Sequence, residues 1–153
     1  MHLRLIAVGK LREPYLVAAA EDFRRRLRPY HRLEEIEVRA GDGSDAARSM
    51  AGEAEAILRH VAPSDHVWLL ERTGTETSSE ELAARIERLA VDGTSQLTLI
   101  VAGTYGAAPS LLERAQFRWS LSRLTLLHEW ARALVLEQLY RAAKIAANEP
   151  YHH

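Results

Sequence analysis

Short apolar segments alternate with longer amphipathic segments along the whole chain, and this alternation is the feature that most constrains the fold. The strand-like segments are residues 3–8, 33–38, 66–70, 96–101 and 119–122. The helix-like segments are residues 45–60, 78–91 and 128–147, and two more helices are expected to start at Pro14 and Pro109, since proline suits a first helical turn. Strands separated by helices predict an α/β fold, in which helices cover both faces of a mostly parallel sheet.

Three local patterns make this prediction more specific. Residues 33–38 alternate apolar and acidic side chains, which is typical of a half-exposed edge strand. A serine three residues before a glutamate, at Ser78 and Glu81, fits a capping box at a helix start. A spacing of four residues predicts that one face of the first helix is made by Tyr15, Ala19, Phe23 and Leu27.

Length and composition limit the class of protein. The chain has 153 residues, which predicts a single domain over residues 1–153. It has no cysteine, so disulfides and thiolate zinc sites are excluded. The formal net charge of −1 excludes a uniformly basic surface, although a local basic patch remains compatible with nucleic acid. No apolar run has the length of a membrane span or a signal peptide, and we expect a cytoplasmic protein without membrane contact.

Several common catalytic signatures are missing. The chain contains neither GxGxxG nor a Walker lysine motif, and neither HExxH nor GxSxG. Its seven histidines show no metal-ligand spacing apart from the terminal pair His152 and His153, so no metal site is expected. These absences argue against a dinucleotide dehydrogenase, a P-loop NTPase and an α/β-hydrolase.

Ligands of open parallel sheets bind outside the carboxyl ends of the strands, which directs attention to the loops after Leu70, Val101 and Ser122. The glycine-containing loop at residues 102–106 fits either a tight turn or a close backbone approach to a ligand. The stretch at residues 120–128 alternates small polar and apolar side chains. It fits either a strand that leads into a helix or a wall for a purine ring.

Charged residues in two places allow both structural and functional interpretations. Arg132 falls on the apolar side of the final helix, so it is expected to have a partner, either in a structural ion pair or at a functional site. Glu137 and Arg141 are four residues apart and can pair with each other. A basic cluster suits either phosphate contact or a solvated helix face, and it comprises Arg24, Arg25, Arg26, Arg28, His31 and Arg32.

Several motifs, taken together, resemble those of the SPOUT superfamily of methyltransferases, and most closely the RlmH family of large-subunit ribosomal RNA methyltransferases. They are LIAVGK at 5–10, VAGTYG at 101–106, WSLS at 119–122, LTLLH at 124–128, AR at 131–132, LEQLYRA at 136–142 and PYH at 150–152. The resemblance covers essentially the whole chain. The sequence departs from the family pattern at Ala102, where the family usually has glycine, and at His153, where it usually has lysine or arginine.

This resemblance implies a C-terminal trefoil knot, one of the rare exceptions to unknotted folds, and a homodimer with a shared active site. It implies S-adenosylmethionine as cofactor, without a metal, and N3 of a pseudouridine in large-subunit ribosomal RNA on the assembled ribosome as the substrate. Carried over, the expected cofactor-binding residues are Leu70, Glu71, Gly103, Ser122, Arg123, Leu124, Thr125, Leu126 and Leu127.

The N3 proton of the target base must be removed, and a histidine is a suitable general base near neutral pH. The candidates for holding or deprotonating the base are His128, Arg132 and His152. The candidates for RNA binding are Arg24, Arg25, Arg28, Tyr151, His152 and His153. Two alternatives stay open: a SPOUT methyltransferase that acts on another RNA such as transfer RNA, and an α/β ligand-binding module without catalysis.

Overall fold

Strands and helices alternate in the computed structural model, which describes residues 1–151. The strands are β1 (His2–Val8), β2 (Arg32–Val38), β3 (His66–Glu76), β4 (Gln96–Val101) and β5 (Phe117–Ser120). The helices are α1 (Pro14–Leu27), α2 (Ala46–Leu58), α3 (Ser79–Val91), α4 (Pro109–Arg114) and α5 (His128–Ala146). The predicted order of elements is therefore confirmed.

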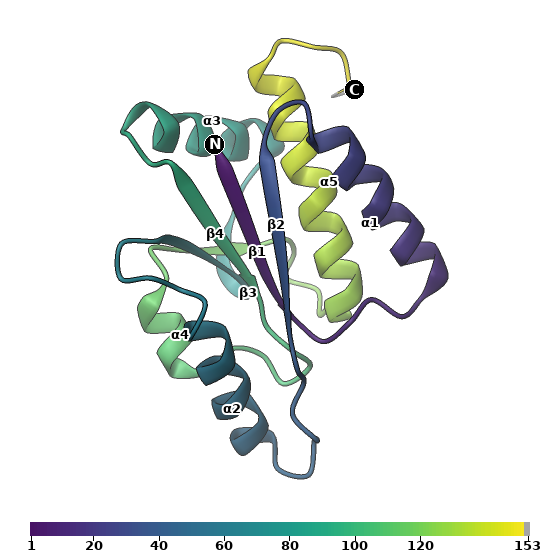
Figure 1. The fold of residues 1–153 in the computed structure, drawn as a ribbon, viewed down its shortest axis with the longest axis vertical. Coiled ribbons are helices and arrows are strands. Elements are labelled where there is room, and N and C mark those ends of the chain that lie inside the picture. Colours follow the sequence, from purple (N-terminus) through teal and green to yellow (C-terminus); the bar gives the residue numbers. More distant parts are fainter. Residues whose placement is uncertain (152–153) are drawn as a thin grey trace.

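The five strands form one sheet in the order β2-β1-β4-β3-β5, and every neighbouring pair is parallel. Helices α1, α3 and α5 cover one face, and α2 and α4 cover the other (Figure 1). The predicted parallel sheet with helices on both faces is thus confirmed. The alternating segment at 33–38 belongs to β2, which lies at an edge of the sheet as expected.

The central strands are apolar because both of their faces are buried. In β1, Leu3 and Leu5 pack into the cluster under α1, α3 and α5, while Ile6 and Val8 pack into the cluster under α2 and α4. Successive side chains of a strand point to opposite faces, so an unbroken apolar run is what a doubly covered strand requires. None of the helices within residues 1–151 is long and apolar enough to cross a membrane.

The capping box before α3 is present, since the Ser78 hydroxyl accepts a hydrogen bond from the Glu81 amide and the Glu81 carboxylate accepts one from the Ser78 amide. The predicted face of α1 is partly wrong. Leu27 is buried, but Tyr15 is 56% exposed and Leu16 takes the expected buried place. A helix turns about 100° per residue, so a strict four-residue spacing drifts about 40° per step away from the core.

Two strand boundaries differ from the prediction. Strand β3 does not end at Leu70 but continues to Glu76, with a register shift between Leu70 and Thr75. Strand β5 begins two residues earlier than the expected segment and ends at Ser120. The extension depends on pairing with β5, in which Thr75 lies opposite Trp119, and a pairing between distant segments leaves no local pattern in either one.

Candidate active site

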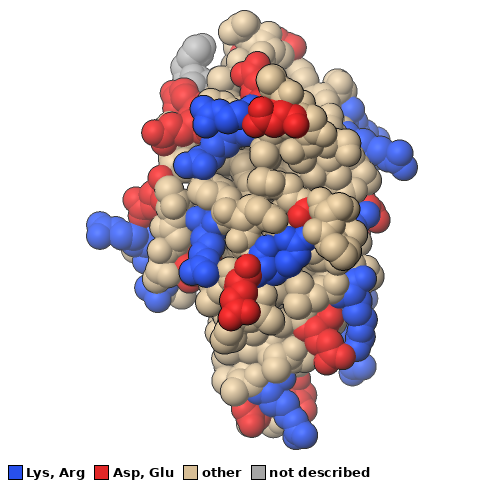
Figure 2. Space-filling view, turned by 90° about the vertical axis from the view of Figure 1, so that its left-hand side faces the viewer, with Lys and Arg blue, Asp and Glu red and all other residues tan. Residues whose placement is uncertain are grey.

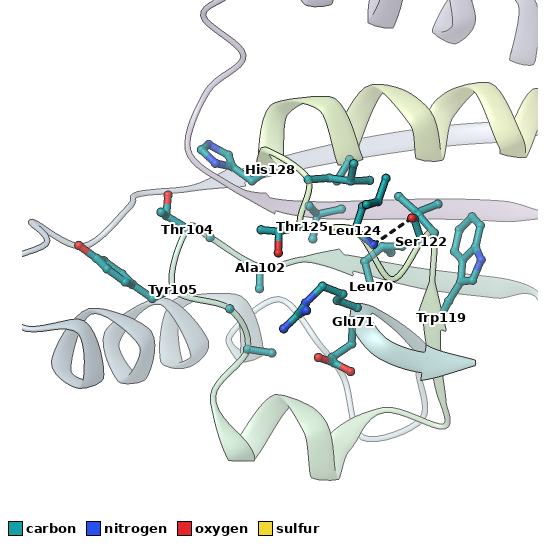
Figure 3. A pocket seen from close by; sticks show the side chains of 18 residues that line it. Leu70, Glu71, Ala102, Thr104, Tyr105, Trp119, Ser122, Leu124, Thr125 and His128 are labelled. Carbon is teal, nitrogen blue, oxygen red and sulfur yellow. Dashed lines mark hydrogen bonds between the residues drawn. The ribbon is translucent and has the colours of Figure 1, made fainter. Parts of the chain in front are cut away.

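A cavity of about 430 Å³ lies where β4 and β5 end and where β3 passes Leu70, its last residue paired with β4 (Figure 3). The segments after Leu70, Val101 and Ser122, which the sequence indicated, all contribute to it, although the first is part of β3 and not a loop. Of the nine residues expected to bind the cofactor, those that line the cavity are Leu70, Glu71, Gly103, Ser122, Leu124, Thr125 and Leu126. Arg123 and Leu127 do not line it: the Arg123 side chain is 93% exposed near Glu76, and Leu127 is 51% exposed.

The glycine-containing loop is both a tight turn and a wall of the cavity. The amide of Gly106 donates to the carbonyl of Gly103 at 3.0 Å, and Gly106 has a φ of 90°. A Cβ atom on Gly103 would stand 2.7 Å from the Glu53 Oε1 atom and 3.0 Å from Val8 Cγ1. Glycine is therefore required at position 103, because Glu53 and Val8 pack against the loop and leave no room for a side chain.

Glu53 is a residue near the site that the sequence analysis missed. It lies on α2 and is only 6% exposed, and its Oε2 atom accepts a hydrogen bond from the Gly41 amide at 2.8 Å. Its Oε1 atom is buried without a hydrogen-bond partner in the described part of the chain. The sequence did contain a sign that Glu53 is buried, because it precedes the apolar Ile57 by four residues and thus falls on the apolar face of the helix.

We expect Gly103→Ala to destabilise the protein by about 1–3 kcal/mol, the usual cost of overpacking, because the new methyl group meets Glu53 and Val8. Urea unfolding measures the loss. Adding Glu53→Ala removes the nearer obstacle, so the two substitutions should couple favourably in a double-mutant cycle.

Gly52→Ala is the matched control. Nothing lies within 4 Å of its Cβ position on α2, and the substitution should stabilise the protein by about 0.5–1 kcal/mol. Equal effects at both glycines would contradict the clash.

Side-chain hydrogen bonds shape the segment after β5. The hydroxyl of Ser120 donates to the Arg72 carbonyl at 2.8 Å, which joins the end of β5 to the extension of β3. The hydroxyl of Ser122 accepts a hydrogen bond from the Leu124 amide at 3.0 Å (Figure 3). The loop thereby presents polar backbone and apolar side chains to the same cavity, with Leu124 72% exposed.

The first turn of α5 carries His128 and Glu129. His128 lines the cavity, and its Nδ1 atom is buried without a partner within residues 1–151. Glu129 is 8% exposed and accepts hydrogen bonds from the backbone amides of Arg12 and Glu13, at the start of α1. Helix α1 has no side-chain cap of its own, so Glu129 supplies one from another helix. The hydrogen bond from the Arg12 amide lowers the pKa of Glu129.

This lowered pKa predicts an acid-dependent contribution of Glu129 to stability. The contribution is fully present above the ordinary glutamate pKa and is lost as the pH falls through the lower pKa of the folded state. The difference in melting temperature between the native protein and Glu129→Gln should therefore be largest near neutral pH and shrink below about pH 4. A difference that stayed constant from pH 7 to pH 3 would show that the carboxylate charge is not what caps α1.

Arg132 does not line the cavity. Its side chain is 5% exposed and forms ion pairs with Glu37 at 2.8 Å and with Glu35 at 3.5 Å. Its Nη1 atom also lies 3.4 Å from the Gly9 carbonyl oxygen, to which it donates. The sequence allowed either a structural ion pair or a functional role for Arg132, and the structure contains the ion pair. Arg132 follows His128 by one turn of α5.

Two of the RNA-binding candidates are engaged in ion pairs. Arg24 pairs with Glu35 at 2.8 Å, and Arg25 pairs with Asp22 at 2.6 Å. Arg28 is exposed. On the face that Figure 2 presents, Lys and Arg are interspersed with Asp and Glu, and no large area carries a single sign of charge.

The C-terminal candidates lie at the other end of α5 or outside the described residues. The Tyr151 hydroxyl donates to Glu137 at 3.1 Å, the Arg141 guanidinium stacks 4.7 Å over its ring, and burial raises the pKa of Tyr151. Arg141 also pairs with Glu137 at 2.7 Å, as the four-residue spacing predicted. His152 and His153 lie outside residues 1–151. Since His128 and Arg141 are 13 residues apart on one helix, about 20 Å separates them.

The residues around the cavity do not form a metal centre. Within residues 1–151, no group of three or more His, Asp or Glu side chains is placed to hold a metal ion. Besides backbone groups, the lining includes one carboxylate, one guanidinium, one imidazole and four hydroxyl side chains, which suits an organic ligand with both polar and apolar parts.

Comparison with known proteins agrees with this geometry. The family model described as predicted SPOUT methyltransferase matches residues 1–152. The chain is 44% identical to ribosomal RNA large subunit methyltransferase H of Gloeobacter violaceus, over 100% of this chain and 99% of that protein. It is 44% identical to the protein of the same name from Moorella thermoacetica and 40% identical to that from Bifidobacterium adolescentis, each over 99% of both chains. The chain therefore belongs to the SPOUT methyltransferase family.

Proposed function

We propose that this enzyme transfers a methyl group from S-adenosylmethionine to N3 of a pseudouridine in large-subunit ribosomal RNA, on the assembled ribosome. The observation that carries the proposal is the cavity at the carboxyl ends of β4 and β5, beside residues 70–72 of β3, in a chain that matches its ribosomal RNA methyltransferase relatives over their full length. The position of the cavity is where open parallel sheets bind their ligands.

The residues of the cavity fit S-adenosylmethionine. Its volume of about 430 Å³ lies within the range of small-molecule sites, about 300–1,000 Å³. Leu70, Leu124 and Leu126 offer apolar walls for a purine ring, while Glu71 and the backbone of the glycine loop offer polar groups. When bound, this cofactor supplies an electrophilic methyl group on a positively charged sulfur.

The chain's own residues must then position the base and remove its N3 proton. His128 is the residue that we assign to this proton, because it lines the cavity and has a buried ring nitrogen without a partner in the described residues. A ring nitrogen of His128 would accept the N3 proton as the new N–C bond forms. Positioning of the two reactants supplies much of the remaining rate enhancement.

We further propose that the enzyme acts as a homodimer in which the tail of one subunit completes the site of the other. The Tyr151 side chain lies beside Glu137 and Arg141, which follow His128 of the same chain by 9 and 13 residues, about 14–20 Å along α5, so the tail of that chain is poorly placed to reach its own cavity. An exposed apolar patch offers a surface for a second copy. It is formed by Tyr15, Leu124, Leu127, Trp130 and Leu134.

The oligomeric state tests this part of the proposal. The patch residue Trp130 is 45% exposed and packs on Tyr15 with 5.9 Å between the ring centroids. We expect Trp130→Glu to shift the protein from dimer to monomer in analytical ultracentrifugation and to abolish methyl transfer. A native protein that sediments as a monomer at micromolar concentration would exclude the shared site.

The resemblance also implies a trefoil knot, and we include it in the proposal. The segment involved would be the one after β5, and β5 itself lies tightly against the extension of β3. A Cβ on Gly74 would stand 2.5 Å from the Arg118 carbonyl oxygen, and Ser120 donates to the Arg72 carbonyl. These segments are packed too closely for a side chain to be inserted between them.

Methyl transfer from labelled S-adenosylmethionine tests the function. The substrates are intact ribosomes, isolated large subunits, free large-subunit RNA and transfer RNA. We expect label in large-subunit RNA within ribosomes, at a pseudouridine that mass spectrometry locates. Thr125→Trp, which fills the cavity, should abolish both cofactor binding and transfer, while Ala84→Trp on the exposed side of α3 should change neither.

The other outcomes separate the alternatives. Label in transfer RNA alone would keep the cofactor but replace the substrate. No cofactor binding and no label in any RNA would leave an α/β ligand-binding module as the better account.

A further inference from the structure

A second hollow, of about 330 Å³, lies between α1, β2 and the first turns of α5. It is separate from the cofactor cavity: His128 lines the first, and Arg132, one helical turn later, lines the second. Three cations, two carboxylates and two apolar side chains line it. These residues are Lys10, Arg24, Arg132, Glu35, Glu37, Leu11 and Val17.

Two lining residues of this hollow carry buried polar atoms that have no partner within residues 1–151. Arg132 uses its two terminal nitrogens on Glu37 and Glu35, but its Nε atom is buried and unpaired. Glu35 uses Oε2 on Arg24 and Arg132, but its Oε1 atom is buried and unpaired. Such atoms are costly, because each has lost its hydration without gaining a hydrogen bond.

The unpaired atoms are of opposite kinds, and this restricts the ligand. The Nε–H group of Arg132 requires an acceptor, and the Oε1 atom of Glu35 requires a donor. A phosphate group offers acceptors only and would meet two carboxylates in the hollow. The edge of a nucleobase offers an acceptor and a donor side by side, and unpaired RNA bases are recognised by such edge contacts and by stacking on arginine guanidinium planes.

The remaining charges suit an RNA chain. The three cations exceed the two carboxylates by one positive charge. Lys10 lies exposed at the rim and forms no ion pair within the described residues. A lysine in this position can contact the phosphate of a nucleotide whose base occupies the hollow.

We propose that this hollow binds one unpaired nucleobase of the RNA, next to the nucleotide that is methylated. The proposal rests on the proposed function, because it assigns the flanking base to the hollow and the target base to the cavity beside His128. His128 lines the cavity and Arg132 lines the hollow, and one turn of α5, about 6 Å, separates them. This distance is comparable to the spacing of neighbouring nucleotides in an extended strand. The hollow thus fixes the register of the RNA.

Filling the hollow tests the proposal in the intact enzyme. Val17→Trp occupies the space without removing a charge, and Ala84→Trp on α3 is the matched control. We expect Val17→Trp to raise the KM for ribosomes about tenfold, the loss of two hydrogen bonds, while the Kd for S-adenosylmethionine stays unchanged. Lys10→Glu, at an exposed position that folding does not depend on, should raise the same KM and leave the melting temperature unchanged.

A binding experiment identifies the ligand directly. AMP, CMP, GMP, UMP and inorganic phosphate are titrated separately into the labelled protein, and amide shifts are followed by NMR. We expect at least one nucleotide to shift the amides of Lys10, Val17 and Arg132 in the native protein but not in Val17→Trp. Equal shifts with phosphate alone would overturn the proposal in favour of a simple anion site, and no shift with any nucleotide would overturn it altogether.

The two proposals can fail independently. Nucleotide shifts around the hollow in a protein that methylates no RNA would contradict the proposed function alone. Methyl transfer to ribosomal RNA with an unchanged KM in both Val17→Trp and Lys10→Glu would contradict the hollow as a base site and leave the function intact.

Discussion

Arg132→Met is expected to lower the free energy of unfolding by about 3 kcal/mol, because it leaves Glu35 and Glu37 without their buried partner. Breaking a buried ion pair by removing one member costs about 3–5 kcal/mol. The lower end applies here, since Glu37 is 39% exposed and can regain water, and Glu35 keeps its contact with Arg24. Urea unfolding followed by circular dichroism measures the change.

A second ion pair gives the matched control. Arg59 and Glu55 form an exposed pair on α2 at 2.9 Å, with side chains 69% and 71% exposed. Arg59→Met should cost no more than about 0.5 kcal/mol, the usual worth of such helix pairs. Adding Glu37→Leu to Arg132→Met should recover part of the loss, because an apolar pair replaces an unpaired charge. Similar small losses at Arg132 and Arg59 would show that the buried pair is not holding β2 against α5.

The architecture was predictable because its signals are local. The apolar run of β4 reflects the burial of both its faces. The alternation in β2 correctly predicted an edge strand, but its acidic side chains do not mark an uncovered face: Glu35 is 14% exposed and pairs with Arg24 of α1 and Arg132 of α5. Parallel strands bring their carboxyl ends to the same edge, so the segments after Leu70, Val101 and Ser122 were expected to meet there, and all three line the cavity. That the first of them continues β3 and is not a loop was not expected.

The partners of the charged residues were not predictable. Arg132 is 95 residues away from Glu37 and 97 from Glu35, and no local pattern joins them. Glu53 contacts the glycine loop from α2, and its role is recognisable only once the fold places Gly103 against it. The same holds for Glu129, which caps a helix more than a hundred residues earlier in the chain.

The sequence also did not predict which side chains of the site segment face the cavity. The expected cofactor segment at residues 122–127 is continuous in sequence, yet Arg123 and Leu127 turn away from the cavity. In an irregular loop, hydrogen bonds such as that between Ser122 and Leu124 decide which side chains face inward, and no periodicity reveals them. Likewise, the tail motif indicated a functional Tyr151 but not its place beside Glu137.

The largest effect on activity is expected at His128. If this residue removes the N3 proton of the target base, His128→Ala should lower the rate of methyl transfer at saturating substrate by about 10²–10⁴-fold. Binding of S-adenosylmethionine should stay nearly unchanged, because the apolar wall of the cavity is made by Leu70, Leu124 and Leu126. His60→Ala, at an exposed position outside the cavity, is the matched control and should transfer methyl groups normally.

Chemical rescue separates proton transfer from a structural role of this side chain. His128→Gly leaves space at the cavity wall, and added imidazole can enter it and accept the proton in place of the missing ring. We expect the rate of His128→Gly to rise with imidazole concentration and to rise more steeply at a pH where more imidazole is unprotonated. A His128→Ala rate within twofold of the native rate would exclude His128 as the base. A large loss that imidazole does not relieve would assign it instead to the shape of the α5 start, where its neighbour Glu129 anchors α1.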